Sequence, residues 1–176
     1  RAPFGVDHFL DVALFQAATT RRSLDAMFEA IFDSLELPRR ILRLKARAMK
    51  TTGVSWYDLE APLAGLGDGE EAIDWIRATE TVQTAFSRSY PKLGSFVQSI
   101  CERNWIEWEP RANKRPGAFC TGSLLTGESR IFMTYNGTMG DVRTLAHEAG
   151  HAFHSFILRD MRAYGRSYPM TLAESA

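Results

Sequence analysis

Residues 144–154 read Thr144-Leu-Ala-His-Glu-Ala-Gly-His-Ala-Phe-His154, and this segment gives the clearest indication of how the chain folds. Residues 147–151 follow the pattern H-E-x-x-H. A helix turns by about 100° per residue, so side chains four residues apart lie on one face, about 40° from each other. His147 and His151 can therefore converge on one metal ion, while Glu148 points about 100° away from His147 and stays near that ion. The stretch predicts a helix that presents two histidines to a cleft.

This helix is expected to run from about Gly140 to Arg159. Thr138 and Asp141 form a capping-box pattern at its start. Its other side is apolar and is expected in the core: Val142, Leu145, Ala146, Ala149, Ala152, Phe153 and Phe156. A pair of surface histidines that bind no metal is the less favoured interpretation.

A catalytic zinc site needs a third protein ligand and an open position. His154 lies on the same face but two turns from His147, which favours a supporting or packing role for it. Glu174 follows His151 by 23 residues, in what reads as the next helix, and could return to the metal from an antiparallel neighbour. Judged from the residues alone, Glu174 could equally be an ordinary exposed glutamate of a helix. Ile157 occupies the position of the third metzincin histidine, which excludes that class.

Upstream of about residue 105 the chain is predicted to be helical. Apolar residues recur at helical spacing over 6–17, 24–35, 73–89 and 91–101. The expected helix boundaries are an N-cap at Ser23, a stop at Pro38, which can also open the next helix, a cap pair at Asp68 and Glu71, an end near Ser89 and a restart at Pro91. The basic residues within 39–50 are interpreted as a solvated helix face, with anion binding as the less favoured alternative.

Downstream of Trp105 the pattern changes to loops and short strands. Residues 107–117 read as a loop, and 118–121 and 130–135 as strands joined by a turn around Gly127 into a hairpin. Ala118 and its neighbours could pair with an extended peptide as an added strand, or they could simply pack in the core.

Composition excludes several classes of protein. The 176 residues include 21 basic and 21 acidic ones, so bulk charge offers no hold on nucleic acid or a membrane surface. No apolar run reaches the length of about 18 residues that a membrane span requires. Two cysteines, with no leader pattern at Arg1, fit a cytoplasmic protein. Both ends read as cut, so we expect a piece of a longer protein, truncated at both ends.

Several stretches carry a resemblance to a known family: Tyr57-Asp-Leu-Glu-Ala-Pro-Leu63, Lys114-Arg-Pro-Gly-Ala-Phe119, Met133-Thr-Tyr-Asn-Gly-Thr-Met-Gly-Asp141, the stretch 144–154, and Pro169-Met-Thr-Leu-Ala-Glu-Ser-Ala176. Together they resemble the oligoendopeptidase F family of thimet-oligopeptidase-like zinc metallopeptidases. The resemblance runs from about residue 40 to the end and is strong in the last 65 residues.

The resemblance implies a mainly α fold, a helical zincin-type metallopeptidase region with a small β hairpin or sheet beside the H-E-x-x-H helix. It implies one partial catalytic domain over residues 1–176. Its expected parts are a helical part over 1–104, a loop and small β element over 105–136, and active-site helices over 140–176.

It also implies a zinc-dependent endopeptidase that hydrolyses internal bonds of short peptides. By matching positions, His147, His151 and Glu174 would bind one Zn²⁺ per chain, and Glu148 would be the catalytic base. The strand over 117–121, with Gly117, Ala118 and Phe119, would pair with the substrate backbone.

Two alternatives stay open. One is a zinc carboxypeptidase of similar helical fold. The other is an inactive fragment that binds peptides, because the family's downstream catalytic Tyr and His lie beyond Ala176.

Overall fold

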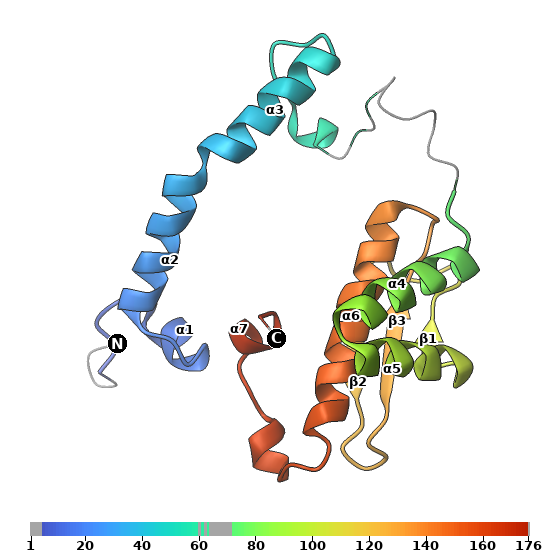
Figure 1. The fold of residues 1–176 in the computed structure, drawn as a ribbon. Coiled ribbons are helices and arrows are strands. Elements are labelled where there is room, and N and C mark those ends of the chain that lie inside the picture. Colours follow the sequence, from blue (N-terminus) through green and yellow to red (C-terminus); the bar gives the residue numbers. More distant parts are fainter. Residues whose placement is uncertain (1–4, 60, 62, 64–71, 176) are drawn as a thin grey trace. The chain divides into compact units, whose positions relative to one another are not determined.

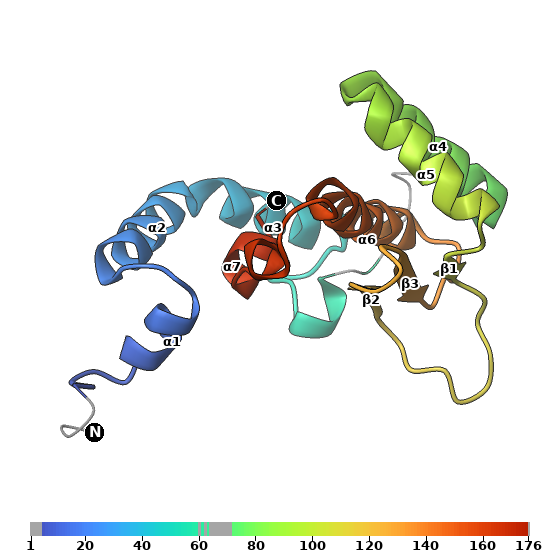
Figure 2. The same cartoon turned by 90° about the horizontal axis from the view of Figure 1, so that it is seen from below.

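The computed structural model describes residues 5–59, 61, 63 and 72–175. The chain separates into two compact units, residues 1–70 and 71–176, each treated by itself below. Helices dominate, and a small three-stranded sheet is the only β structure in the described residues (Figures 1 and 2). This confirms the mainly α fold, while the single catalytic domain over 1–176 remains a prediction. Among the described helices, none has both the length and the apolar character to cross a membrane.

The first unit contains α1 (Asp11–Gln16), α2 (Arg21–Ser34), α3 (Glu36–Ala48) and the short 3-10 helix η2 (Trp56–Asp58). The expected cap at Ser23 is wrong, because the Thr20 side chain accepts from the Ser23 backbone N–H at 3.1 Å and is the N-cap of α2. The stop at Pro38 comes earlier than expected, because α2 ends at Ser34 and Leu35 separates it from α3. Pro38 does lie in the first turn of the next helix, where helix N–H groups have no partner to lose.

The apolar stripes of the first unit form helices but bury little in it. Neither α1 nor α2 contains a buried residue, and α3 buries only Ala46. The basic face of α3 is partly occupied by the chain itself. Lys45 donates from Nζ to the carbonyls of Leu59 and Ala61, at 2.6 and 2.8 Å. This agrees with the interpretation as an ordinary helix face.

The second unit contains α4 (Trp75–Ser89), α5 (Pro91–Glu102), α6 (Met139–Leu158), the 3-10 helix η3 (Ala163–Arg166) and α7 (Met170–Ala173). The end of α4 at Ser89 and the start of α5 at Pro91 are as predicted. The first turn of α4 is capped by Asp74, whose side chain accepts from the Arg77 backbone N–H at 2.7 Å. The cap pair expected at 68 and 71 lies outside the described residues.

The sheet consists of β1 (Ile106–Glu107), β2 (Ala118–Gly122) and β3 (Ser129–Met133), in the spatial order β1-β3-β2. The predicted hairpin is confirmed, since β2 and β3 are antiparallel, with Cys120 opposite Ile131. Gly127 has φ +68° in the turn, a conformation that glycine adopts without strain. Strand β1 pairs with β3 in parallel and was not predicted, because two residues show no alternation.

One core unites the sheet with α4, α5 and α6. Its fully buried large side chains are Val97, Ile100, Ile131, Met133 and Leu145. Trp75 and Trp108 stack against each other at the margin, with ring centroids 4.6 Å apart. Helix α6 therefore has one face in the core and another free to carry chemistry, as its sequence indicates.

Two sets of contacts fix the start of α6. Thr138 and Asp141 form the predicted capping box. Just before it, Gly137 accepts from the Ile73 backbone N–H at 2.9 Å, and the Tyr135 hydroxyl donates to the Ile73 carbonyl at 2.7 Å. Gly137 has φ +85°, and a Cβ there would lie 3.2 Å from Cβ of Ala72, so a larger residue would push these segments apart. The register of α6 is thereby set against the segment that enters α4.

Candidate metal centre

The described residues contain one cluster that could hold a metal ion: His147, His151 and Glu174. Nε2 of His147 lies 3.3 Å from Oε2 of Glu174, and Nε2 of His151 lies 3.6 Å from the same oxygen. The two imidazole Nε2 atoms are 3.0 Å apart. The three residues that the sequence singled out as ligands are thus brought together.

The donor set and its spacing fit zinc. A tetrahedral zinc ion with ligands at about 2.0–2.1 Å separates neighbouring ligand atoms by about 3.4 Å. The three measured separations, 3.0, 3.3 and 3.6 Å, bracket that value. Two imidazoles and one carboxylate leave a fourth position for water or substrate, which is the ligand pattern of catalytic rather than structural zinc sites.

Glu174 reaches the histidines because the chain turns back after α6. Arg166, at the end of η3, holds this turn to the C-terminus of α6. Its Nε donates to the Met161 carbonyl at 2.8 Å, and its Nη2 donates to the Arg159 carbonyl. Arg159 is the C-cap of α6 and Met161 lies just beyond it, so the guanidinium bonds to carbonyls at the end of the helix and places the following segment alongside α6.

His154 contributes a second anchor for the returning segment. Its ring lies 4.9 Å from the ring of Tyr168, just before α7. Its Nδ1 is buried and has no hydrogen-bond partner in the part of the chain that the structure describes. Sequence reasoning assigned this residue a supporting or packing role, and its contacts agree with that role.

Glu148 lies on the inner side of α6 and is only 6% exposed. Burial raises the pKa of this carboxyl above its ordinary value, and the neighbouring His147 and His151 partly offset that rise. Its charge also reaches β2, where burial chiefly, and Glu148 in addition, raise the pKa of the Cys120 thiol to about 11. A carboxyl beside a metal cluster, with its basicity increased by burial, is equipped to accept a proton.

Strand β2 is one of the two edge strands of the sheet, and the side of β2 that faces away from β3 is called its free edge here. The Thr134 N–H donates to the Gly117 carbonyl, and the Ser123 N–H donates to the Glu128 carbonyl. In an antiparallel pair every second residue bonds to its partner, so Gly117, Phe119, Thr121 and Ser123 face β3 with their peptide groups. The residues between them turn their peptide groups to the free edge: Ala118, Cys120 and Gly122.

This register divides the three expected substrate-binding residues. Ala118 directs its peptide groups to the free edge. Gly117 and Phe119 use theirs within the hairpin, and the Phe119 ring stacks on Phe132 at 5.1 Å. Cys120 and Gly122 were missed as edge residues, because the sequence predicted the hairpin but not which residues pair across it.

Comparison with known proteins gives the family. The model of peptidase family M3 matches residues 89–176, half of the chain. The plasmid-encoded oligoendopeptidase F of Lactococcus lactis subsp. cremoris is 30% identical over 97% of this chain and 28% of its own length. Oligopeptidase PepF of Bacillus subtilis (strain 168) is 25% identical over 94% of this chain and 24% of its own length. The chain thus spans about a quarter of the relatives it matches.

Solved structures agree with this relationship. A Bacillus anthracis str. Ames protein superposes with a TM-score of 0.72 at 20% identity, covering 91% of this chain and 30% of that one, which supports the fold. PZ peptidase A with inhibitor 2 superposes with a TM-score of 0.59 at 25% identity, covering 69% of this chain and 21% of that one. The matched segment contains α6, the H-E-x-x-H motif and Glu174. The chain therefore belongs to peptidase family M3.

Proposed function

We propose that the protein is a zinc-dependent endopeptidase that hydrolyses internal bonds of short peptides. The observation that carries the proposal is the convergence of His147, His151 and Glu174, whose donor atoms lie within 4.8 Å of one another. Family membership supports it, because the relatives are named as oligopeptidases and oligoendopeptidases. The two cysteines are free thiols, which supports a cytoplasmic location.

The site residues divide the chemistry between them. One zinc ion per chain, bound by the three ligands, would supply Lewis acidity to the peptide carbonyl and to the attacking water. Glu148, next to His147 in the sequence, accepts the proton of that water as it attacks the carbonyl carbon. The same carboxyl then passes the proton to the leaving amine. Its burial keeps bulk water away from this proton.

The substrate would bind as an extended strand along the free edge of β2. The peptide groups of Ala118, Cys120 and Gly122 are available for that pairing, and the substrate's side chains then alternate between α6 and solvent. Such binding depends more on the backbone of the substrate than on its side chains, as an enzyme that acts on varied short peptides requires.

The test compares Glu148→Gln with Glu80→Gln, an exposed glutamate on α4, in the full-length protein. After dialysis, about one zinc per chain is expected in wild type and in both variants. Glu148→Gln should lose hydrolysis of an internally quenched peptide blocked at both ends, while Glu80→Gln retains it. Turnover by Glu148→Gln would refute the base assignment. Cleavage of unblocked peptides alone would favour a carboxypeptidase, and zinc binding by the full-length protein without any cleavage would refute the peptidase function. Zinc binding without cleavage by the 176-residue chain alone would favour an inactive peptide-binding fragment.

A further inference from the structure

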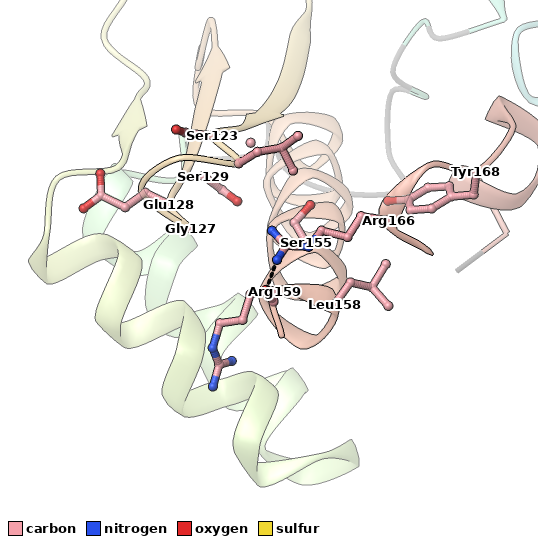
Figure 3. A pocket seen from close by; sticks show the side chains of 11 residues that line it. Ser123, Gly127, Glu128, Ser129, Ser155, Leu158, Arg159, Arg166 and Tyr168 are labelled. Atoms are coloured by element: carbon pink, nitrogen blue, oxygen red, sulfur yellow. Dashed lines mark hydrogen bonds between the residues drawn. The ribbon is translucent and has the colours of Figure 1, made fainter. Parts of the chain in front are cut away.

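We propose that the pocket between the β2–β3 turn, the C-terminal end of α6 and Tyr168 is a substrate subsite for one large apolar side chain. The inference rests on the proposed peptidase function and adds a side-chain preference to it. The pocket has a volume of about 190 Å³. Its walls come from three segments, shown in Figure 3: the hairpin turn with Ser123 and Gly127, α6 with Ser155 and Leu158, and the returning segment with Tyr168. Gly122, at the end of β2, and Leu124 also line it.

The pocket lies next to the metal cluster along α6. Ser155 follows His151 by four residues, as His151 follows His147, so all three share one helix face. A Cβ built on Gly122 would lie 3.9 Å from Ser155 Oγ, which brings the end of the β2 edge to the same place. The pocket therefore begins about 6 Å beyond His151, one helical turn.

That offset matches the repeat of a bound strand. Side chains on one face of an extended peptide recur every 6.6 Å or so, two residues apart. A peptide paired with Ala118, Cys120 and Gly122, with its cleaved bond at the cluster, would direct toward the pocket a side chain one or two residues from that bond. The absence of a side chain at Gly122 leaves the entrance open.

The lining favours an apolar side chain because its charged groups have other partners. Arg166 donates to the Arg159 and Met161 carbonyls. The Arg159 guanidinium lies 3.9 Å from the centre of the Phe156 ring and points away from the pocket (Figure 3). Glu128 is paired with Arg130 at 2.9 Å.

The remaining wall has the large side chains of Leu124, Leu158 and Tyr168, together with small residues: Gly122, Ser123, Gly127, Ser129 and Ser155. Among these, Leu124, Leu158 and Tyr168 supply the contact area for an apolar group. Leu124 is 68% exposed, so a bound apolar group would cover it. An engineered apolar cavity of about 150 Å³ holds benzene, so a pocket of this size can hold an aromatic or a large branched side chain.

The experiment measures kcat/KM of the full-length protein with a positional library of internally quenched peptides. Wild type should favour Phe or Leu over Ala at one position within two residues of the cleaved bond. Ser155→Phe fills the pocket and should reverse this preference, lowering kcat/KM for the Phe peptide by about tenfold or more relative to the Ala peptide. Ile157→Phe introduces the same side chain at an exposed position of α6 outside the pocket and should leave the profile unchanged.

A second variant tests the subsite independently, in case Ser155→Phe does not fold. Leu158→Ala enlarges the pocket and should shift the preference at the same position toward Trp. An active Ser155→Phe or Leu158→Ala enzyme with the wild-type profile at every position overturns the subsite while leaving the peptidase proposal intact. Failure of wild type to cleave any library peptide overturns the peptidase proposal and the subsite with it.

Discussion

The ring of Tyr168 packs 4.9 Å from the ring of His154, at a tilt of 34°. This contact joins the helix that carries two of the metal-binding candidates to the segment that carries the third. His154 lies one turn beyond His151, and Tyr168 lies six residues before Glu174. Helix α7, between Tyr168 and Glu174, has only four residues, which are too few to form a stable helix without tertiary contacts. The orientation of the Glu174 carboxylate therefore depends on this ring contact and on Arg166.

Replacing Tyr168 by Ala should weaken zinc binding without removing a ligand. Loss of residues that orient ligands lowers metal affinity by about 10–100-fold, and we expect a decrease in that range. Zinc affinity is measured by competition with a chromogenic chelator. Tyr164→Ala is the control, because Tyr164 lies in the same returning segment but is 93% exposed. Equal affinities for the two variants would show that the Tyr168 contact does not position Glu174.

Backbone pairing along β2 predicts that N-methylation of the substrate lowers kcat/KM only at alternate positions. Only every second amide of an added strand points toward the sheet. Single N-methylation at successive positions of a good substrate should therefore lower kcat/KM at alternate positions and leave the intervening ones nearly unchanged. A hydrogen bond lost in this way costs about 0.5–1.5 kcal/mol, or about 2- to 13-fold in kcat/KM. A uniform response, or none, would contradict binding as an added strand.

The sequence predicts the parts of this site that depend on local pattern. The spacing of His147 and His151 fixes a shared helix face, and Thr138 with Asp141 fixes where that helix starts. On the residues alone Glu174 was one of two equal alternatives, and only the resemblance favoured it as a ligand, since its return depends on contacts made by Arg166 and Tyr168. The free peptide groups of β2 were not predicted, because they depend on which residues pair across the hairpin.

The helix boundaries that were wrong have a related cause. Ser23 and Thr20 are both good N-cap residues, and only the backbone conformation, extended at Thr20, decides between them. Pro38 opens α3 as its sequence allows, but a proline is tolerated anywhere in the first turn, so its position does not fix the boundary, which lies at Leu35. Strand β1 consists of two residues, held by pairing with β3 rather than by any pattern of its own.

Close packing of α4 against α5 predicts a sharp effect at Gly94. A Cβ there would lie 2.0 Å from Ser87 Oγ and 2.9 Å from Ser87 Cα, so backbone must move. Gly94→Ala should lower the free energy of unfolding by about 1–3 kcal/mol. Gly150→Ala is the matched control inside α6, where nothing lies within 4 Å of the added Cβ, and it should stabilise by up to about 1 kcal/mol. Chemical denaturation measures both, and equal effects would contradict the close helix contact.

The thiol of Cys120 should resist alkylation until the pH is well above neutral. Burial is the main cause that raises its pKa to about 11 from an ordinary 9.0, and the charge of Glu148 adds to the rise. Only the thiolate reacts, and raising the thiol pKa from 9.0 to about 11 lowers the thiolate fraction about a hundredfold at pH 8. The folded state disfavours the thiolate, so this thiol's contribution to stability is complete below pH 9.0 and is lost as the pH rises through about 11.

Rates of iodoacetamide labelling, followed by peptide mapping against pH in folded and denatured protein, measure this effect. Glu148→Gln removes the neighbouring charge and should shift the Cys120 profile to lower pH, whereas Glu80→Gln should not. Labelling of Cys120 in the folded protein as fast as in the denatured one would contradict its burial beside Glu148. A shift specific to Glu148→Gln would place an ionised carboxylate beneath β2, where the proposed mechanism needs its base.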